Sequence, residues 1–220
     1  MRNAYTEQLE LLHSEMVHMG KLCETAVNNA ICALTDNDLT LLGTVFETDG
    51  EIDRLEREVE SLCMKLLLRQ QPVASDLRAI SSALKMISDM ERIGDQASDI
   101  GEIVRFIVGR TNHNEQNLQQ MALAAVKMVN DSVDSYVKKD LQLAAAVIEY
   151  DDVVDDWFVR IKRELIGLIQ TDGSQGEYYV DLLMIAKYLE RIADHATNIA
   201  EWVEYSITGT HVSHEHGGAV

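Results

Sequence analysis

Acidic residues recur on one helical face at two places in this 220-residue sequence. Residues in an α-helix turn by about 100° each, so positions i, i+4, i+8 and i+11 share one face about 80° wide. The first set at this spacing is Glu91, Asp95, Asp99 and Glu102, and the second is Glu190, Asp194, Asn198 and Glu201. Like charges one turn apart repel each other on an open helix. The two copies of this pattern therefore indicate that a positive group lies against each of them.

Another acidic stripe precedes the first one along the chain. It consists of Asp49, Asp53, Glu56 and Glu60, which again share one face of a helix. If the two helices pack side by side, the stripes can face each other. Carboxylate oxygens grouped without cysteine or a well-placed histidine suit cations such as Mg²⁺, Mn²⁺, Fe³⁺ or Ca²⁺. The alternative is a solvent-exposed acidic face, which is the commoner outcome for acids at this spacing.

A different metal pattern, Glu-x-x-His, is typical of ferritin-like bundles. Glu10 with His13 and Glu15 with His18 match it, but both pairs lie on one expected helix, whereas that site takes its pairs from different helices. We interpret both matches as coincidental. His195 lies about 140° around the helix from the first acid of its stripe, so we expect it to flank the site rather than bind metal.

The composition excludes several classes of function. There are 19 basic and 37 acidic residues, a formal charge of −18, which opposes binding to nucleic acid. The sequence contains no Gly-rich phosphate loop, no dinucleotide fingerprint and no nucleophile with a paired base, so we expect no enzymatic activity. It also contains no apolar run of ~20 residues and opens on no signal peptide, so we expect a cytoplasmic protein. Cys23, Cys32 and Cys63 are expected to be buried thiols.

The chain is organised as a repeat of three long helices. A single proline and an abundance of helix-forming residues predict helix almost throughout. We expect helices over residues 5–34, 39–70, 75–108, 116–137, 140–169 and 177–207. The two halves predict an all-α fold of two tandem three-helix bundles, covering residues 1–110 and 115–208, followed by a disordered tail at 209–220. The repeat also aligns residues 47–53 with 149–155, so Asp151 and Asp155 correspond to the two aspartates of the first half.

The two motifs Glu-Arg-Ile-Gly-Asp, from Glu91, and Glu-Arg-Ile-Ala-Asp-His, from Glu190, resemble the paired signature of the PhoU family, the regulators of bacterial phosphate uptake. The resemblance covers residues 5–208. It implies a cytoplasmic, non-enzymatic repressor of phosphate uptake and of phosphate-starvation signalling. The implied partners are the phosphate ABC transporter and the sensor histidine kinase of the phosphate two-component system, and we expect a homodimer.

The resemblance also implies metal clusters on these acidic motifs, holding iron, manganese, magnesium or zinc. The matching positions are Asp49, Asp53, Glu91, Asp95 and Asp99 in the first half and Asp151, Asp155, Glu190, Asp194 and Asn198 in the second. We expect the second cluster to bind metal more weakly, because Asn198 stands where the first half has an acid, and Phe158 and Lys162 stand where it has Glu56 and Glu60. Two alternatives stay open: a metal-storage or metal-dependent carboxylate-bundle protein, and an accessory protein of another anion transporter.

Overall fold

The computed structural model describes residues 2–70, 73–107, 109 and 116–210, and this part of the chain is helical with no strand. The long helices are α1 (Arg2–Thr35), α2 (Leu41–Gln70), α3 (Ala74–Ile107), α4 (Gln116–Lys138), α5 (Leu141–Thr171) and α6 (Gly176–Thr208). A short 3₁₀ helix, η1 (Gly173–Gln175), precedes α6. The predicted all-α fold is confirmed.

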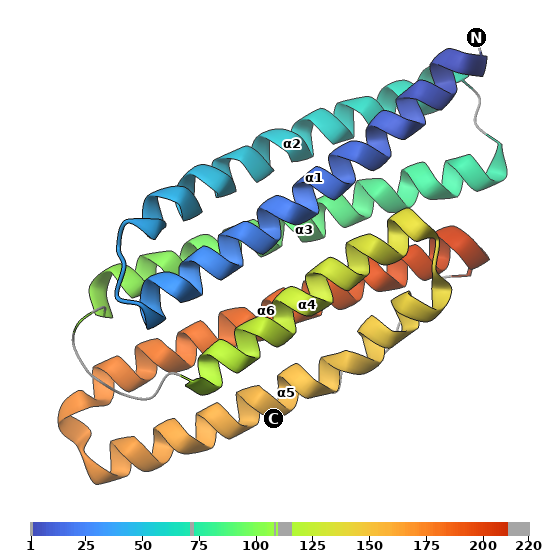
Figure 1. Ribbon diagram of the computed structural model, residues 1–220. Coiled ribbons are helices and arrows are strands. Elements are labelled where there is room, and N and C mark those ends of the chain that lie inside the picture. Colours follow the sequence, from blue (N-terminus) through green and yellow to red (C-terminus); the bar gives the residue numbers. More distant parts are fainter. Residues whose placement is uncertain (1, 71–72, 108, 110–115, 211–220) are drawn as a thin grey trace.

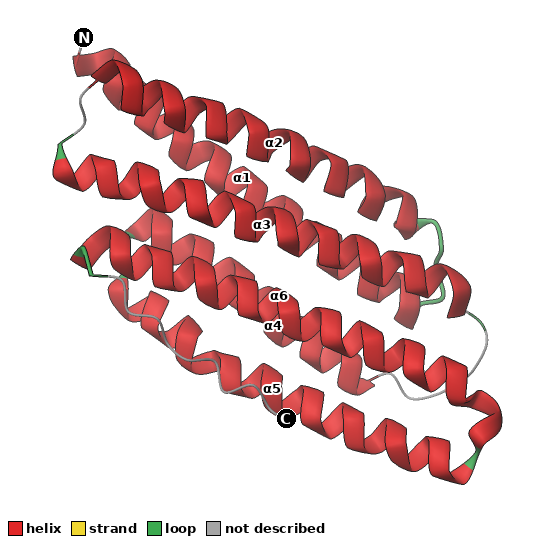
Figure 2. Ribbon diagram, turned by 180° about the vertical axis from the view of Figure 1, so that it is seen from behind, coloured by secondary structure: helices red, strands yellow, loops and turns green. Residues whose placement is uncertain are grey.

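The helices form two elongated bundles that lie alongside each other, α1–α3 in one and α4–α6 in the other (Figure 1). The two bundles meet through α3 against α6 and through α1 against α4, while α2 and α5 each contact only their own bundle. Seen from behind, α3 and α6 run side by side through the middle of the molecule (Figure 2). Because α2 packs on α3, and α5 on α6, the acidic stripes predicted on these helices come from neighbouring elements.

The turns between the first two helices of each bundle show the repeat at atomic detail. Asn37, at φ 55°, and Lys139, at φ 51°, are the non-glycine residues with a left-handed backbone in the described part of the chain, and they lie 102 positions apart. An aspartate follows each of them. Asp38 accepts a hydrogen bond from the Thr40 amide, and Asp140 caps α5 by accepting bonds from two amides of its first turn. The same sequence position therefore builds the same turn twice.

The helix limits agree with the predicted limits to within three residues at every end. The short helix η1 was not predicted; its formation is favoured by Asp172, whose side chain accepts a hydrogen bond from the Ser174 amide at 3.0 Å. Residues 71–72, most of the gap between the helices predicted at 75–108 and 116–137, and most of the predicted tail at 209–220 lie outside the described residues. The domain limits at 110 and 115 therefore stay a prediction.

The apolar residues that accompany the acidic stripes form the centre of the core. Ile93, Ile100, Ile192 and Ile199 are all fully buried, and burying each isoleucine contributes about 1.5–3 kcal/mol. Two of the three cysteines, Cys23 and Cys63, are buried, but Cys32 is only partly buried, contrary to expectation.

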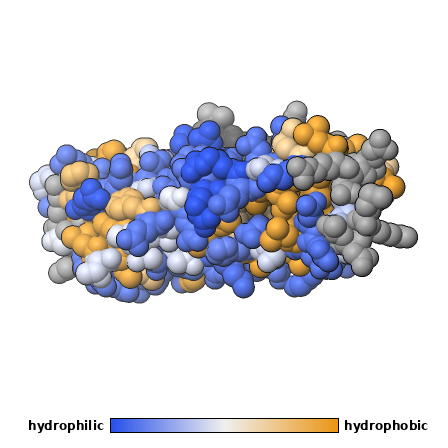
Figure 3. All heavy atoms as spheres, turned by 90° about the horizontal axis from the view of Figure 1, so that it is seen from above, coloured by the Kyte–Doolittle hydropathy of each residue, from blue (hydrophilic) through white to orange (hydrophobic). Residues whose placement is uncertain are grey.

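On the surface, the face drawn in Figure 3 is hydrophilic across its middle, with hydrophobic side chains gathered toward both ends. None of the helices in the described part of the chain has the run of apolar residues that crossing a membrane requires.

Candidate metal centre

Three aspartates converge between α2 and α3 in the first bundle. Asp49 and Asp53 lie one turn apart on α2, and Asp95 lies opposite them on α3. Each is partly buried, and each offers one carboxylate oxygen such that the three oxygens lie within 4.8 Å of one another. Among the residues that the structure describes, this is the one group of three acidic, histidine or cysteine side chains close enough to share a cation.

The close approach of the two helices depends on Gly94. A Cβ atom at this position would lie 3.0 Å from Asp49 Oδ1 and 3.0 Å from Ile52 Cδ1, which is tighter than an ordinary contact. The same Asp49 oxygen is buried and has no hydrogen-bond partner among the described residues. A buried acceptor without a donor costs free energy unless something positive meets it. The residues present therefore fit a small cation bound by carboxylate oxygens.

The electrostatics of the cluster favour the same conclusion. Burial raises the pKa of Asp49, and the charges of Asp95, Asp53 and Asp99 raise it further, against a hydrogen bond from Ser98 that lowers it. Burial also raises the pKa of Glu91, and the neighbouring Asp95 adds to this effect. Raised carboxyl pKa values mean that negative charge is disfavoured here when no cation is present. A metal ion would reverse this balance.

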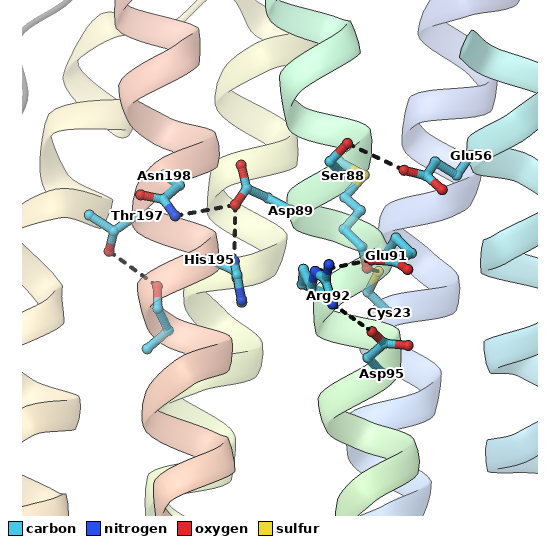
Figure 4. A network of polar contacts seen from close by, with 12 residues as sticks. Cys23, Glu56, Ser88, Asp89, Glu91, Arg92, Asp95, His195, Thr197 and Asn198 are labelled. Carbon is cyan, nitrogen blue, oxygen red and sulfur yellow. Dashed lines mark hydrogen bonds and ion pairs between the residues drawn. The ribbon is translucent and has the colours of Figure 1, made fainter. Parts of the chain in front are cut away.

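Side chains at the rim of the cluster hold some of its acids in place (Figure 4). Arg92 lies with Nη1 3.3 Å from Asp95 Oδ2 and with Nε 3.5 Å from Glu91 Oε2. Ser88 donates a hydrogen bond from Oγ to Glu56 Oε1 at 3.3 Å. The arginine is well exposed, so its ion pairs contribute only about 0–1 kcal/mol to stability. Arg92 therefore neutralises the edge of the cluster without replacing a metal at its centre.

Two of the predicted ligands, Asp99 and Asn198, have partners in the opposite bundle. Tyr188 of α6 hydrogen-bonds to Asp99, and Asn198 Nδ2 donates to Asp89 Oδ1 of α3 at 3.2 Å. Residues 89 and 188, like 99 and 198, are 99 positions apart, so these are one contact made twice across the bundle interface. Asp99 and Asn198 each lie eight residues after the first acid of their stripe. Eight residues turn a helix by about 80°, so both side chains point toward the bundle interface rather than along the direction of that first acid. Neither belongs to the close group of three.

His195 also lies at this interface. Its Nδ1 atom is 2.9 Å from Asp89 Oδ1, so Asp89 contacts both His195 and Asn198 of α6 (Figure 4). The histidine is thus engaged by the other bundle, in keeping with the flanking position expected from its angle on the helix. Asp89 was missed by the sequence analysis because it lies outside the repeated acidic stripe. Alignment of the two halves could have identified Asp89, because it corresponds to Tyr188. Each of these two residues contacts the acidic stripe of the opposite bundle, Tyr188 at Asp99 and Asp89 at Asn198.

The second bundle supplies a positive side chain of its own, Lys187, at its acidic cluster. Burial raises the pKa of Asp155, and the charges of Glu190, Asp194 and Asp152 raise it further, whereas Lys187 lowers it. Lys187 forms an ion pair with Glu190, whose side chain is almost completely buried.

The first bundle differs at the two positions that hold this cation. The Lys187 ammonium lies 5.3 Å from the centre of the Phe158 ring. At the equivalent positions the first bundle has Ser88 and Glu56, which bond to each other. The second bundle therefore has a lysine over an aromatic ring where the first has a serine–glutamate pair, and the lysine supplies positive charge.

Residue 193 also separates the two clusters. Ala193 occupies the position of Gly94, so α6 carries a Cβ atom where α3 has none. Asp151, the equivalent of Asp49, is partly buried on α5, and within residues 116–210 no three acids meet as they do in the first bundle. The weaker metal binding predicted for the second cluster stays a prediction, and Lys187 and Ala193 give it a physical basis.

The fold and this site define a class: a helical protein made of two equivalent three-helix bundles with carboxylates between the second and third helices. Comparison with known proteins identifies the family. The family model described as the PhoU domain matches residues 16–104 and again residues 118–203. The chain belongs to the PhoU family, as its motifs predicted.

Relatives of known name match over almost the whole chain. A Clostridium acetobutylicum protein named "Phosphate-specific transport system accessory protein PhoU homolog" is 35% identical, over 96% of this chain and 97% of its own. A Pseudomonas aeruginosa protein of the same name is 36% identical, over 96% and 88%. The crystal structure of PhoU from P. aeruginosa superposes with a TM-score of 0.89 at 35% identity, covering 94% of this chain and 100% of that one. The phosphate transport system regulatory protein PhoU from Streptococcus pneumoniae gives a TM-score of 0.88 at 26% identity, covering 95% and 99%.

Proposed function

We propose that this protein is a cytoplasmic negative regulator of phosphate uptake and of phosphate-starvation signalling. In this proposal it is a homodimeric, non-enzymatic adaptor between the phosphate ABC transporter and the phosphate-sensing histidine kinase. The observation that carries the proposal is its similarity to proteins of the phosphate-specific transport system, which extends over 96% of this chain at 35% identity.

We further propose that a metal cation joins α2 to α3 in the first bundle. Asp49, Asp53 and Asp95 would bind it, and Glu91 and Asp99 would contribute charge from the edge. A site made only of carboxylates suits magnesium, manganese or iron, whereas zinc more often takes nitrogen or sulfur ligands. The cation would offset the repulsion among the acids and hold α2 at a fixed distance from α3. It would therefore stabilise the surface that α2 presents away from the core.

The second cluster, made by Asp151, Asp155, Glu190 and Asp194, would play the same part with less dependence on metal. Its acids already face Lys187, which lowers the pKa of Asp155 against the effect of the neighbouring acids. An adaptor with one metal-dependent and one metal-independent bundle could couple metal supply to only one of its two contact surfaces. We therefore expect metal removal to weaken the contacts of α1–α3 more than those of α4–α6.

Deletion of the protein tests the regulatory role. In phosphate-rich medium the deletion strain should express phosphate-starvation genes, and the parent chain supplied on a plasmid should restore repression. Asp95→Ala should restore it only partly, whereas Lys138→Asn, a change at an exposed residue at the end of α4, should restore it fully. An unchanged transcriptional response in the deletion strain would favour a metal-storage or metal-dependent bundle protein instead.

A further inference from the structure

A second site of opposite charge lies between the two bundles, where α1, α3, α4 and α6 meet. It is a cavity of ≈ 200 Å³ near the start of α3 and the ends of α4 and α6. Its lining includes His13, Ser75, Arg78, Tyr136, Lys139 and Ser206. Since a water molecule takes about 30 Å³ of liquid volume, the cavity has room for a tetrahedral ion and several waters.

The lining of this cavity is basic in a strongly acidic protein. Arg78, Lys139 and His13 all contribute side chains, and no carboxylate is among the lining residues, although the chain has 37 acids and 19 basic residues. Burial lowers the pKa of His13, and the charge of Lys139 lowers it further. Positive groups gathered in this way attract an anion.

Hydrogen-bond donors are also available there. Arg78 Nε donates to the Ser206 carbonyl at 3.5 Å, a contact that holds the guanidinium at the cavity while its terminal nitrogens keep further donors. Ser75 lies in the first turn of α3, where the helix dipole favours negative charge. Its Oγ donates to Asp76 Oδ1 at 3.4 Å, and the Leu77 amide of the same turn bonds to the Val73 carbonyl. The ends of α4 and α6 also reach this region, but the Asp140 and Gly209 amides already satisfy carbonyls of their last turns.

The two principal basic residues of the cavity are not repeated in the other half of the chain. Lys139 is equivalent to Asn37, and Arg78 is equivalent to Glu177, at the steps of 102 and 99 residues that relate the two halves. Asn37 uses its side-chain oxygen to accept a bond from the Gly109 amide at 3.0 Å, which ties its turn to the end of α3. A lysine cannot accept such a bond. Position 139 therefore carries a cation, whereas the equivalent Asn37 makes a hydrogen bond that fixes its turn. Lys139 also has a left-handed backbone, which asparagine adopts more readily than lysine does.

We propose that this cavity binds a small tetrahedral oxyanion, with orthophosphate as the probe of choice. Arg78 and Lys139 would supply the charge, His13 and Ser75 would supply additional hydrogen bonds, and the Tyr136 ring would form one wall. The site goes beyond the adaptor role and does not depend on it, because anion binding here requires no metal and no partner protein. A ligand at this place would touch both bundles and so bias how they pack.

Isothermal titration of the purified full-length protein with orthophosphate, in the presence of chelator, tests the proposal. Chelator separates this cavity from phosphate bound through metal at the acidic cluster. Lys139→Asn introduces the residue found in the equivalent turn, so the backbone should be undisturbed. Lys138→Asn is the matched control, because that lysine is the neighbouring residue, is exposed and pairs with Asp134 outside the cavity. Arg78→Gln is the second test variant.

The parent protein and Lys138→Asn should bind orthophosphate equally, and Lys139→Asn and Arg78→Gln should each raise the Kd about tenfold or more, equivalent to about 1.4 kcal/mol. Arg78→Gln also loses the bond to the Ser206 carbonyl, so its melting temperature is measured as well. If Arg78→Gln unfolds, the comparison of Lys139→Asn with Lys138→Asn alone tests the proposal. Absence of binding to the parent at 10 mM orthophosphate, at roughly 0.1 M salt, would overturn the proposal. An equal loss in Lys138→Asn and Lys139→Asn would overturn it too, because binding would then reflect surface charge alone.

Discussion

Gly94→Ala is the substitution that most directly probes the geometry of the first cluster. The added Cβ atom would lie 3.0 Å from Asp49 Oδ1, so either that carboxylate or α2 must move by a few tenths of an ångström. The three oxygens that could share a cation lie within 4.8 Å of one another, and carboxylate ligands hold cations at about 2.0–2.6 Å, so a shift of this size disturbs binding. A tenfold loss of metal affinity would remove about 1.4 kcal/mol of metal-dependent stability at saturating metal.

Gly101→Ala is the matched control, two turns further along the same face of α3. The nearest atom to its added Cβ would be Phe46 Cε1 at 3.4 Å, which is an ordinary contact. Both variants gain up to about 1 kcal/mol of helix propensity, and that gain corresponds to roughly 2–4 °C in melting temperature for a chain of this size. The assay is the melting temperature of tag-free protein over a series of metal concentrations. Gly101→Ala should keep the metal-dependent rise and Gly94→Ala should lose most of it; equal rises in both would refute the role assigned to Asp49.

Two further predictions concern charge. Lys187→Ser introduces the residue found at the equivalent position of the first bundle. It should lower the melting temperature of chelated protein, because Glu190 would stay buried without its cation, and added metal should recover part of the loss. Calorimetry that finds no change would contradict the role assigned to Lys187. Burial and neighbouring charges raise the pKa values of Asp49 and Glu91 in the folded protein above their ordinary values of 3.8 and 4.5. Chelated parent protein should therefore lose stability as the pH rises above these values, because the folded carboxyls keep protons that the unfolded chain has released. Urea unfolding between about pH 4 and pH 7 measures this, and a rise in stability over that range would show that these carboxyls do not govern it.

The repeat and the six helices could be predicted from the sequence because they depend on local periodicity. The stripe of Asp95 is set by the 3.6-residue turn of one helix, and its facing partners Asp49 and Asp53 follow once α2 and α3 are adjacent. Helix ends were equally local, since capping aspartates such as Asp140 act on amides two and three residues away.

The differences between the two clusters could be predicted only in part. Substitution of Glu56 by Phe158 was visible in the alignment, but the ion pair of Lys187 with Glu190 depends on which way a flexible side chain turns in the folded bundle. The role of Asp99 was also hidden, because its partner Tyr188 lies on a helix of the other bundle, and the packing of α3 on α6 is a long-range feature. Local spacing carries no information about such contacts.

Metal is expected to bind chiefly to the first cluster, and paired substitutions test this expectation. Asp95→Ala and Asp194→Ala remove equivalent carboxylates from the two bundles, and bound metal and melting temperature are measured for both and for the parent, with and without chelator. Metal at a hundredfold excess over its Kd should stabilise the parent by ~2.7 kcal/mol. Asp95→Ala should lose most bound metal and most of this chelator-sensitive stability, while Asp194→Ala should keep most of both. If neither substitution changes the metal content and chelator leaves the melting temperature of the parent unchanged, the stripes are solvent-exposed acidic faces and the expectation is wrong.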